Sequence, residues 1–384
     1  MNLGVGASIL VVLAMHGCAQ PDPAAPRAPV PPPAASVEPV AASDAAPSSD
    51  AAPVAERAST PDPEVWLRGT THVHARPSGD SATSIPDVIT YYEQRGYDFI
   101  ALTDHNRISE VGDASTAGSV AVRHPPSGLI VLAGIELTYN PTGCLPPGDA
   151  SGRCRIHVNL LGPTQRFAGK LEWANRQRDE RLEKYQAAID AQKQLGGVIQ
   201  LNHPNWYWGM TPDVLIELAR RGIPLVEIAN SQFTTWNAGD KDHPSTEMLW
   251  DAVLAKGYTM WGVASDDAHD YDPNGGGKYP AGGAWIVVRA RRDPQAIIDA
   301  IARGRFYAST GVALKRAAVE AGELVVEVSP KELGTHTIEL VENGQVVARV
   351  QGKLARRALP ATGYLRAVVS RDDGKRAWVQ PARR

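Results

Sequence analysis

Two histidines two residues apart, His72 and His74, raise the question of metal chemistry. They lie in the stretch GTTHVHARPSGD, residues 69–80, at the end of an apolar, strand-like segment. In a strand, residues i and i+2 point to the same face, so both imidazoles aim at one region. Neutral imidazole is the commonest protein ligand for metal ions. Taken alone, the pair fits a solvated strand face as well as a metal site.

More histidines and acidic residues follow apolar segments further along the chain. The chain has ten histidines, and chance placement on solvated loops would scatter them. The residues at or beside strand-like segments are His72, His74, His105, Glu136, His157, His203, Asp267 and His269. Imidazole and carboxylate together bind first-row divalent metals. Because one ion uses about four ligands, this set predicts two or three ions, with Glu136 able to bridge.

A regular series of strand-like and helix-like segments positions these residues. Repeated β-then-α units predict parallel strands joined by helical crossovers. This number of units favours a closed barrel, in which the C-terminal strand ends meet at one face. The alternative is an open, doubly wound sheet, although no glycine-rich phosphate loop follows the first strand. The strand candidates are residues 66–74, 98–103, 129–137, 155–161, 198–202, 225–229, 259–264 and 284–289.

The order of these motifs resembles a known family. Along the chain come HVH at 72–74, TDH at 103–105, an isolated Glu136, an isolated His157, NHP at 202–204 and DAH at 267–269. The ordered set resembles the PHP (polymerase and histidinol phosphatase) family over about residues 66–310. The resemblance implies a distorted (β/α)7, TIM-like barrel with two or three zinc, manganese or iron ions. The export signal and the sequence GVASDDAH are similar to a branch that includes carbamate-hydrolysing enzymes of the CehA/McbA type.

The same resemblance implies a role for each residue. One ion would be held by His72, His74, Glu136 and Asp267, a second by Glu136, His157 and His203, and a third by His105 and His269. Asp80 stands where some members carry a histidine and is included as a ligand. Its alternative role is to cap the helix expected from about residue 86. Asp266 would point elsewhere, and Asp104 would support the ligands or carry a proton.

The expected activity is hydrolysis of a small-molecule phosphomonoester or phosphodiester by metal-bound hydroxide. Divalent ions lower the pKa of bound water from about 15.7 to near 7, and Asp104 or Asp267 would be the catalytic proton carrier. Arg76 and Arg107 are candidates to bind the substrate phosphate, or they are ordinary surface arginines. Trp206 could stack on the substrate, or wall off the barrel mouth.

Two alternatives to a phosphoesterase stay open. The first is a metal-dependent carbamate, amide or ester hydrolase on the same scaffold. The second is a non-catalytic, tethered metal-binding protein of the envelope. The net charge of −3 and the dispersed lysines and arginines indicate no nucleic-acid surface. No protein partner is predicted.

The N-terminal region indicates export. Residues 1–18 hold a short apolar run ending in Gly17 and Cys18, and resemble a bacterial lipoprotein signal with lipid on Cys18. The implied location is the periplasmic side of the envelope, with the membrane touched only through that lipid. Plain secretion and an uncleaved anchor are the alternatives. Residues 19–63, rich in Ala, Pro, Ser and Asp, predict a disordered tether.

Two further features complete the expected organisation. Cys144 and Cys154 flank the turn-rich LPPGDASGR, which predicts a hairpin disulfide in an oxidising compartment or, alternatively, two reduced thiols. Residues 64–311 would form the metallohydrolase barrel. Residues 312–384 show short alternating segments with turns at 342–344 and 371–374, which predict a small, Ig-like β-sandwich domain. This domain would pack on the barrel, or bind glycan or envelope.

Overall fold

The computed structural model describes residues 62–112, 116, 118–174 and 180–384. The predicted lipoprotein signal, with Cys18, and nearly all of the predicted tether lie outside these residues. Residues 60–384 form one compact unit. No helix in the described ranges has both the length and the apolar character needed to cross a membrane. The division of this unit into two domains stays a prediction.

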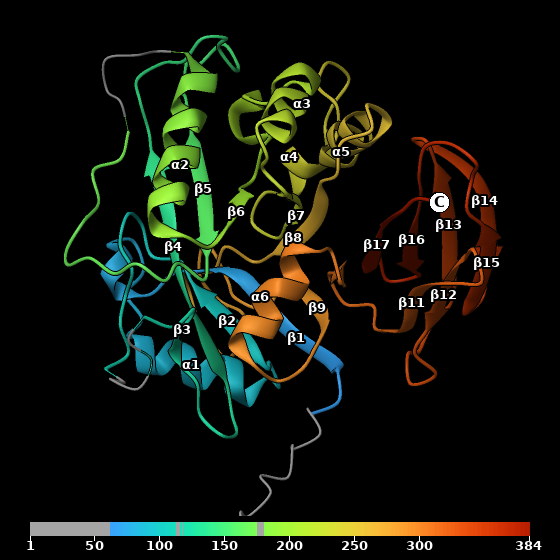
Figure 1. Cartoon of the computed structure of the whole chain (residues 1–384), viewed down its shortest axis with the longest axis horizontal. Coiled ribbons are helices and arrows are strands. Elements are labelled where there is room, and N and C mark those ends of the chain that lie inside the picture. The colour runs from blue at the N-terminus through green and yellow to red at the C-terminus, as the bar shows by residue number, and fades with distance from the viewer. Residues whose placement is uncertain (1–61, 113–115, 117, 175–179) are drawn as a thin grey trace, which may run out of the picture. The chain divides into compact units, whose positions relative to one another are not determined.

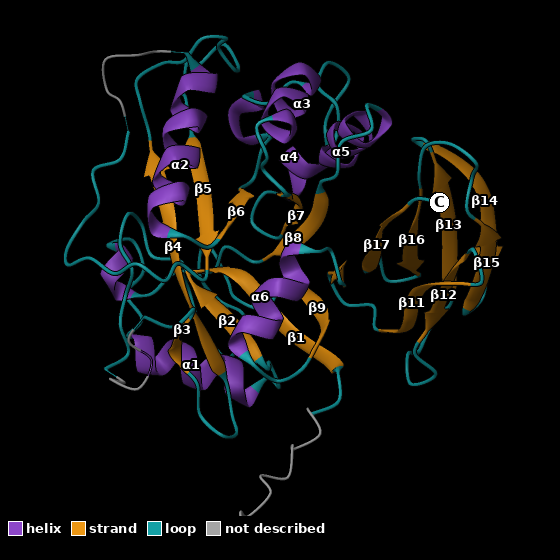
Figure 2. Cartoon of the chain, in the orientation of Figure 1, coloured by secondary structure: helices purple, strands orange, loops and turns teal. Residues whose placement is uncertain are grey.

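The strands expected around the histidine motifs are present (Figure 2). A short additional strand, β3 (Ala121–Arg123), pairs with β4. The others are apolar and largely buried, as the interior of a wide sheet requires. They are β1 (Val65–Val73), β2 (Phe99–Leu102), β4 (Ile130–Tyr139), β5 (Ile156–Leu161), β6 (Val198–Leu201), β7 (Leu225–Asn230), β8 (Trp261–Ser265) and β9 (Trp285–Ala290).

The α-helices start where the sequence offers a capping side chain. Ser84, Thr211, Ser245 and Asp293 each accept a hydrogen bond from a backbone N–H in the first turn. Since Ser84 caps the first helix, Asp80 does not. The α-helices are α1 (Ile85–Gln94), α2 (Arg181–Leu195), α3 (Pro212–Arg220), α4 (Thr234–Ala238), α5 (Thr246–Ala255) and α6 (Pro294–Ala302).

The expected (β/α)7 barrel is wrong. The strands form a mixed, 14-stranded sheet with the order β14-β13-β16-β17-β10-β9-β1-β2-β4-β5-β6-β7-β8, with β3 beside β4 (Figure 1). Pairing is parallel for β1–β2, β2–β4, β6–β7 and β7–β8, but antiparallel for β4–β5, β5–β6 and β1–β9. A barrel of β/α units needs a helical crossover after each strand. Between β4 and β5 the chain instead returns through a loop without a helix.

That returning loop is closed by a disulfide between Cys144 and Cys154. Both cysteines are buried, and their Cα atoms lie 5.6 Å apart. The predicted disulfide is therefore confirmed. The name "disulfide loop" is used below for residues 144–154.

The strands near the C-terminus belong to two sheets, one of which is continuous with the large sheet. β17 (Arg376–Ala382) pairs with β10 (Phe306–Ser309), so β13 (His336–Glu342), β14 (Gln345–Gln351), β16 (Leu365–Arg371) and β17 continue the large sheet. A second sheet holds three strands: β11 (Leu314–Glu320), β12 (Glu323–Val328) and β15 (Leu354–Ala358). Apolar residues of both sheets share one core, including Val326 and Leu340. The large sheet extends to these strands because β10 pairs with β9 along one edge and with β17 along the other.

Candidate metal centre

The nine residues predicted to bind metal lie in one cluster. They lie within strands or in the loops that follow them, except that Asp80 lies in the loop before α1. The end of β1 is joined to the segment after β8, because the His74 N–H donates to the Ala268 carbonyl at 3.0 Å. An isolated parallel bridge similarly joins His105 to Glu136. The contacts connect His72, His74, Asp80, His105, Glu136, His157, His203, Asp267 and His269.

Three groups within this cluster could each hold a metal ion, because the ligand atoms of each group lie within 4.8 Å of one another. Two residues are shared: Glu136 belongs to two groups and so does His74. The sequence did not assign His74 to the third group. The groups are His72, His74 and Glu136; Glu136, His157 and His203; and His74, Asp80, His105 and His269.

Glu136 is the centre of the cluster. Its side chain is 1% exposed, and its two oxygens face different neighbours. Oε1 lies near His72, His157 and His203, whereas Oε2 lies near His74 and His105, at distances from 2.6 to 3.7 Å. A carboxylate with a different set of imidazoles around each oxygen is arranged to bridge two cations.

Asp267 lies beside the first group, and its distances to the two imidazoles of that group suit a shared cation. Asp267 Oδ1 lies 3.1 Å from His72 Nε2 and 3.3 Å from His74 Nε2. Ligands bound to one tetrahedral ion at about 2.0–2.1 Å stand about 3.3 Å apart. Both Nε2 atoms are buried and have no hydrogen-bond partner among the described residues. Since an unsatisfied buried polar atom costs about 1–3 kcal/mol, a coordinated ion would remove this cost.

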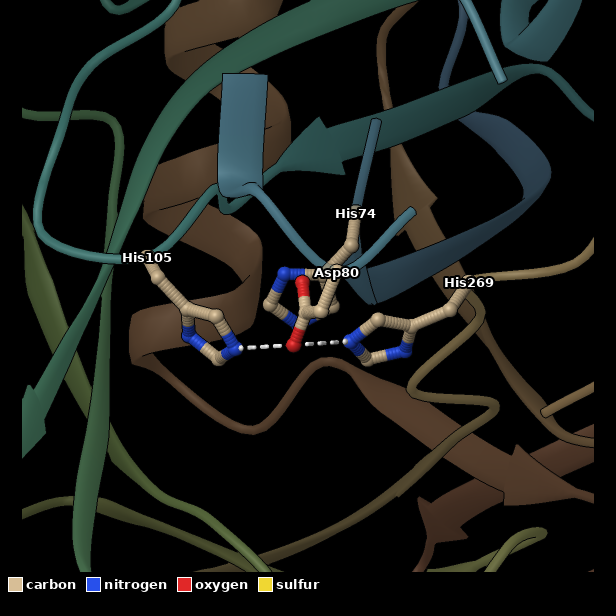
Figure 3. A group of neighbouring side chains, drawn as sticks. All are labelled: His74, Asp80, His105 and His269. Carbon is tan, nitrogen blue, oxygen red and sulfur yellow. Dashed lines mark hydrogen bonds and ion pairs between the residues drawn. The ribbon is translucent and has the colours of Figure 1, made fainter. Parts of the chain in front are cut away.

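The third group, drawn in Figure 3, is the one of the three groups that includes an exposed residue. The Asp80 carboxylate lies between two imidazoles, 2.9 Å from His105 Nε2 and 3.3 Å from His269 Nε2. The ring of His74 stacks on that of His269, with centroids 4.1 Å apart. The Asp80 side chain is 50% exposed, whereas that of His74 is fully buried. A ligand from solvent would therefore approach the cluster on the Asp80 side.

Several polar residues that the sequence did not single out orient the imidazoles. The buried Glu227 of β7 accepts a hydrogen bond from His72 Nδ1 at 2.8 Å. This contact leaves Nε2 of His72 to face a cation. His269 Nδ1 donates to the Asp267 carbonyl at 2.9 Å, so its Nε2 also stays free. Asn202 Nδ2 donates to Glu136 Oε1 at 2.9 Å. The available signal for Glu227 was an acidic residue inside the apolar strand LVEIAN.

The pKa values of two histidines favour the form that binds metal. Burial, together with His269 and His105, lowers the pKa of His74 to about 3. Burial also lowers the pKa of His157 to about 4, although Glu136 opposes the shift. Both imidazoles are therefore neutral near pH 7, as metal ligation requires.

The acidic residues of the cluster stay ionised. Burial alone would raise the pKa of Glu136, but His157, His105 and His72 outweigh it and hold that pKa well below the usual range. For His105, burial opposes the charged form, yet Glu136 and Asp80 raise its pKa to about 10. Buried carboxylates therefore attract positive charge to this position, whether from protons or from cations.

The backbone is unusual at two of the cluster residues. His203 has φ 23° and Asp267 has φ 46°, although neither is glycine. Such left-handed conformations cost about 1–3 kcal/mol each and persist where the surroundings impose them. Glu227 Oε2 accepts the His203 N–H at 2.7 Å and so helps to impose this geometry.

The two other acids of these motifs lie apart from the three groups. Asp104 accepts the Ala75 N–H at 2.7 Å and a hydrogen bond from the Ser109 hydroxyl, and burial raises its pKa to about 6. Asp266 accepts hydrogen bonds from Thr70 and Tyr92, each at 2.8 Å. Asp266 thus points away from the cluster. The role of Asp104 as a proton carrier stays a prediction.

The predicted substrate-binding residues occupy two different places. Arg76 and Arg107 line a common cavity of about 560 Å³, which none of the nine predicted metal ligands lines. Trp206 lies against the cluster, with its ring 5.4 Å from that of His157 and 5.1 Å from that of His203. Of the three, Trp206 is therefore the one in contact with the candidate metal centre.

Comparison with known proteins does not identify a family or a function for this chain. No protein-family model matches the chain, and a search of curated proteins returns no match. The site itself defines a buried histidine and carboxylate cluster that could hold metal ions.

Proposed function

We propose that the protein is a metal-dependent phosphoesterase that hydrolyses a small phosphomonoester or phosphodiester at a centre of two or three zinc, manganese or iron ions. The supporting observation is the position of Glu136 among five imidazoles. A structural metal site needs only one closed set of about four ligands. Three adjoining groups that share residues suit a reaction centre instead.

The contacts support one set of ligands for each proposed ion. His72, His74, Glu136 and Asp267 would hold the first ion, and Glu136, His157 and His203 the second. His105, His269, Asp80 and the shared His74 surround the third position. Divalent ions at such a centre supply Lewis acidity, which polarises a phosphoryl oxygen and lowers the pKa of bound water.

The protein contributes orientation and proton transfer. Glu227 and the Asp267 carbonyl fix the rings of His72 and His269 through their Nδ1 atoms. Asp267 Oδ1 faces His72 and His74, while Oδ2 lies near Asn230 Nδ2 at 3.4 Å. We assign proton transfer to Asp267 Oδ2, because Asp267 contacts His72 and His74 of the cluster, whereas Asp104 lies apart from it.

The place of action is part of the same proposal. The Cys144–Cys154 disulfide is typical of oxidising compartments outside the cytosol. It supports export, with the protein held on the periplasmic side of the envelope by a lipid on Cys18. Labelling with a radioactive fatty acid, compared between the natural chain and Cys18→Ala, tests this part separately.

The activity is tested with three chromogenic substrates on the metal-loaded protein: 4-nitrophenyl phosphate, bis(4-nitrophenyl) phosphate and 4-nitrophenyl acetate. We expect turnover of at least one phosphoester, lost on chelation and in His72→Ala/His74→Ala. His124→Ala is the matched control, since His124 is exposed and outside the cluster. Turnover of the acetate alone would point to an acyl hydrolase. Absence of bound metal in elemental analysis would leave a non-catalytic protein.

A further inference from the structure

A group of aromatic side chains lies beside the second metal position. The name "aromatic turn" is used here for η3 (Trp206–Trp208), the three-residue turn that follows His203. Trp206 contacts the rings of His157 and His203, and Phe233 lies 4.9 Å behind it. Tyr207 stacks on Trp206, with centroids 5.3 Å apart and the rings inclined by 22°. All three residues of the turn are partly exposed.

The disulfide loop holds the aromatic turn in a backbone conformation that is rare for these residue types. Tyr207 has φ 56° and Trp208 has φ 53°, which is costly for non-glycine residues. The Asp149 N–H donates to the Tyr207 carbonyl at 2.9 Å. A Cβ atom on Gly148 would lie 2.1 Å from the same carbonyl oxygen, so only glycine fits there. The loop therefore packs directly on the turn and fixes it.

Two arginines approach the rings, Arg153 within the disulfide loop and Arg155 directly after it. Arg153 Nη1 donates to the Tyr207 hydroxyl at 2.7 Å. The Arg155 guanidinium carbon lies 5.2 Å from the Trp206 centroid and 5.1 Å from the Tyr207 centroid. Neither arginine forms an ion pair with a carboxylate in the part of the chain that the structure describes. Their positive charge is therefore available to an anion.

We propose that the aromatic turn, Arg153 and Arg155 form a substrate subsite for a planar aromatic ring that carries a negative charge. The inference rests on the proposed phosphoesterase function and narrows its substrate class. The reacting phosphate would lie at the metal centre, the ring would stack on Trp206 and Tyr207, and the anionic group would meet the two guanidinium groups. Aromatic faces and guanidinium groups recognise these two features together.

Three phosphate esters separate the contributions of ring and charge. 4-Carboxyphenyl phosphate has both features, phenyl phosphate has the ring alone, and methyl phosphate has neither. Phosphate release from each ester gives kcat and KM for the natural protein and for two variants, Arg153→Ala/Arg155→Ala and Trp206→Ala. Arg291→Ala is the matched control, because Arg291 is an exposed arginine elsewhere on the chain.

The two variants should have different signatures. Loss of both arginines should raise KM for 4-carboxyphenyl phosphate about 10-fold to 100-fold, as expected for hydrogen bonds to a charged group, and leave KM for the other esters nearly unchanged. Trp206→Ala should raise KM about 3-fold to 10-fold for both aromatic esters. If Trp206→Ala fails to fold, Trp206→Leu removes the stacking face with less loss of packing. Equal KM values for the three esters in the natural protein would overturn the subsite.

A binding measurement distinguishes failure of the subsite from failure of the proposed function. 4-Carboxyphenylphosphonate cannot be hydrolysed, and its binding to the metal-loaded protein can be followed through tryptophan fluorescence. Binding that weakens in Arg153→Ala/Arg155→Ala, without turnover of any ester, would keep the subsite and reject the phosphoesterase. Turnover of all esters without any effect of the arginine variant would reject the subsite and keep the phosphoesterase.

Discussion

Two regions in which charge is buried differ in whether the protein alone satisfies that charge. In the first, Arg366 is 3% exposed and donates to both oxygens of Asp251, at 2.7 and 2.6 Å, while the Tyr364 hydroxyl donates to the same carboxylate at 2.6 Å. In the second, the metal cluster, the Nε2 atoms of His72 and His74 are buried without a hydrogen-bond partner among the described residues. In the first region, the charges of Arg366 and Asp251 satisfy each other. The second has room for a cation.

The largest expected effect comes from removing the bridging charge with Glu136→Gln. The amide keeps the shape but not the negative charge that two of the three groups share. We expect loss of at least one bound ion and a fall in phosphoester turnover of about 1,000-fold or more, by analogy with removal of other transition-state charge stabilisers. Elemental analysis and steady-state kinetics measure the two quantities. Unchanged metal content would contradict the bridging role.

In the region around Arg366, Asp251→Ala would leave the buried arginine without its main partner. Breaking a buried pair from one side costs about 3–5 kcal/mol in the free energy of unfolding. Denaturant titration measures that loss, and the metal content per folded molecule should not change. Asp299→Ala is the control: its partner Arg303 lies 3.8 Å away and is 70% exposed, so the change should stay below about 1 kcal/mol. Equal losses in the two variants would remove the distinction between the regions.

A smaller effect is expected from Glu227→Gln, which weakens the orientation of His72 without removing a ligand. Carboxylates behind metal-binding histidines typically contribute about 10-fold to 100-fold in metal affinity. Competition with a chelator of known affinity measures this change. Ser265→Ala is a milder comparison, since the Ser265 hydroxyl donates to the same carboxylate. Full metal affinity in Glu227→Gln would show that the Nδ1 contact does not orient the ligand.

The smallest effect is expected from Tyr364→Phe, which removes one of the donors to Asp251. Since Arg366 still holds both carboxylate oxygens, the loss should be about 1–2 kcal/mol in the free energy of unfolding. Thermal and denaturant unfolding of the variant and the natural protein give this difference. A loss as large as that of Asp251→Ala would mean that the tyrosine, not the arginine, satisfies the buried acid.

The same contrast explains how much the sequence could predict. Histidines and acids lie on β1 and β4 or just after β6 and β8. Their grouping could be predicted because they lie at or beside apolar, strand-like segments in the order of a known family's motifs. Whether neighbouring strands run parallel or antiparallel could not be predicted from the sequence. The antiparallel pairing of β4 and β5 depends on the disulfide loop, and periodicity does not distinguish such a loop from a crossover. Hence the nine candidate residues come together in one cluster, although the predicted barrel is wrong.

Other site features depend on tertiary contacts that one sequence does not contain. Arg76 and Arg107 follow motifs of candidate ligands, yet they line a cavity that none of the nine candidate ligands lines. Arg153 and Arg155 carry no motif and reach the rings of Trp206 and Tyr207 only through the loop between Cys144 and Cys154. Glu227 was detectable as a charge within an apolar strand, but its contact with His72 was not detectable.

The pairing of β17 with β10 sets a limit on how the chain can be shortened. Gln380 on β17 bonds both backbone groups of Gly262 on β8, accepting from its N–H at 2.9 Å and donating to its carbonyl at 2.7 Å. A protein ending at residue 311 would leave those two groups unpaired and the edge of β10 bare. An uncovered strand edge can pair with another molecule. Expression of the N-terminal part alone should therefore yield aggregates, and the last strands act as a cover against self-association.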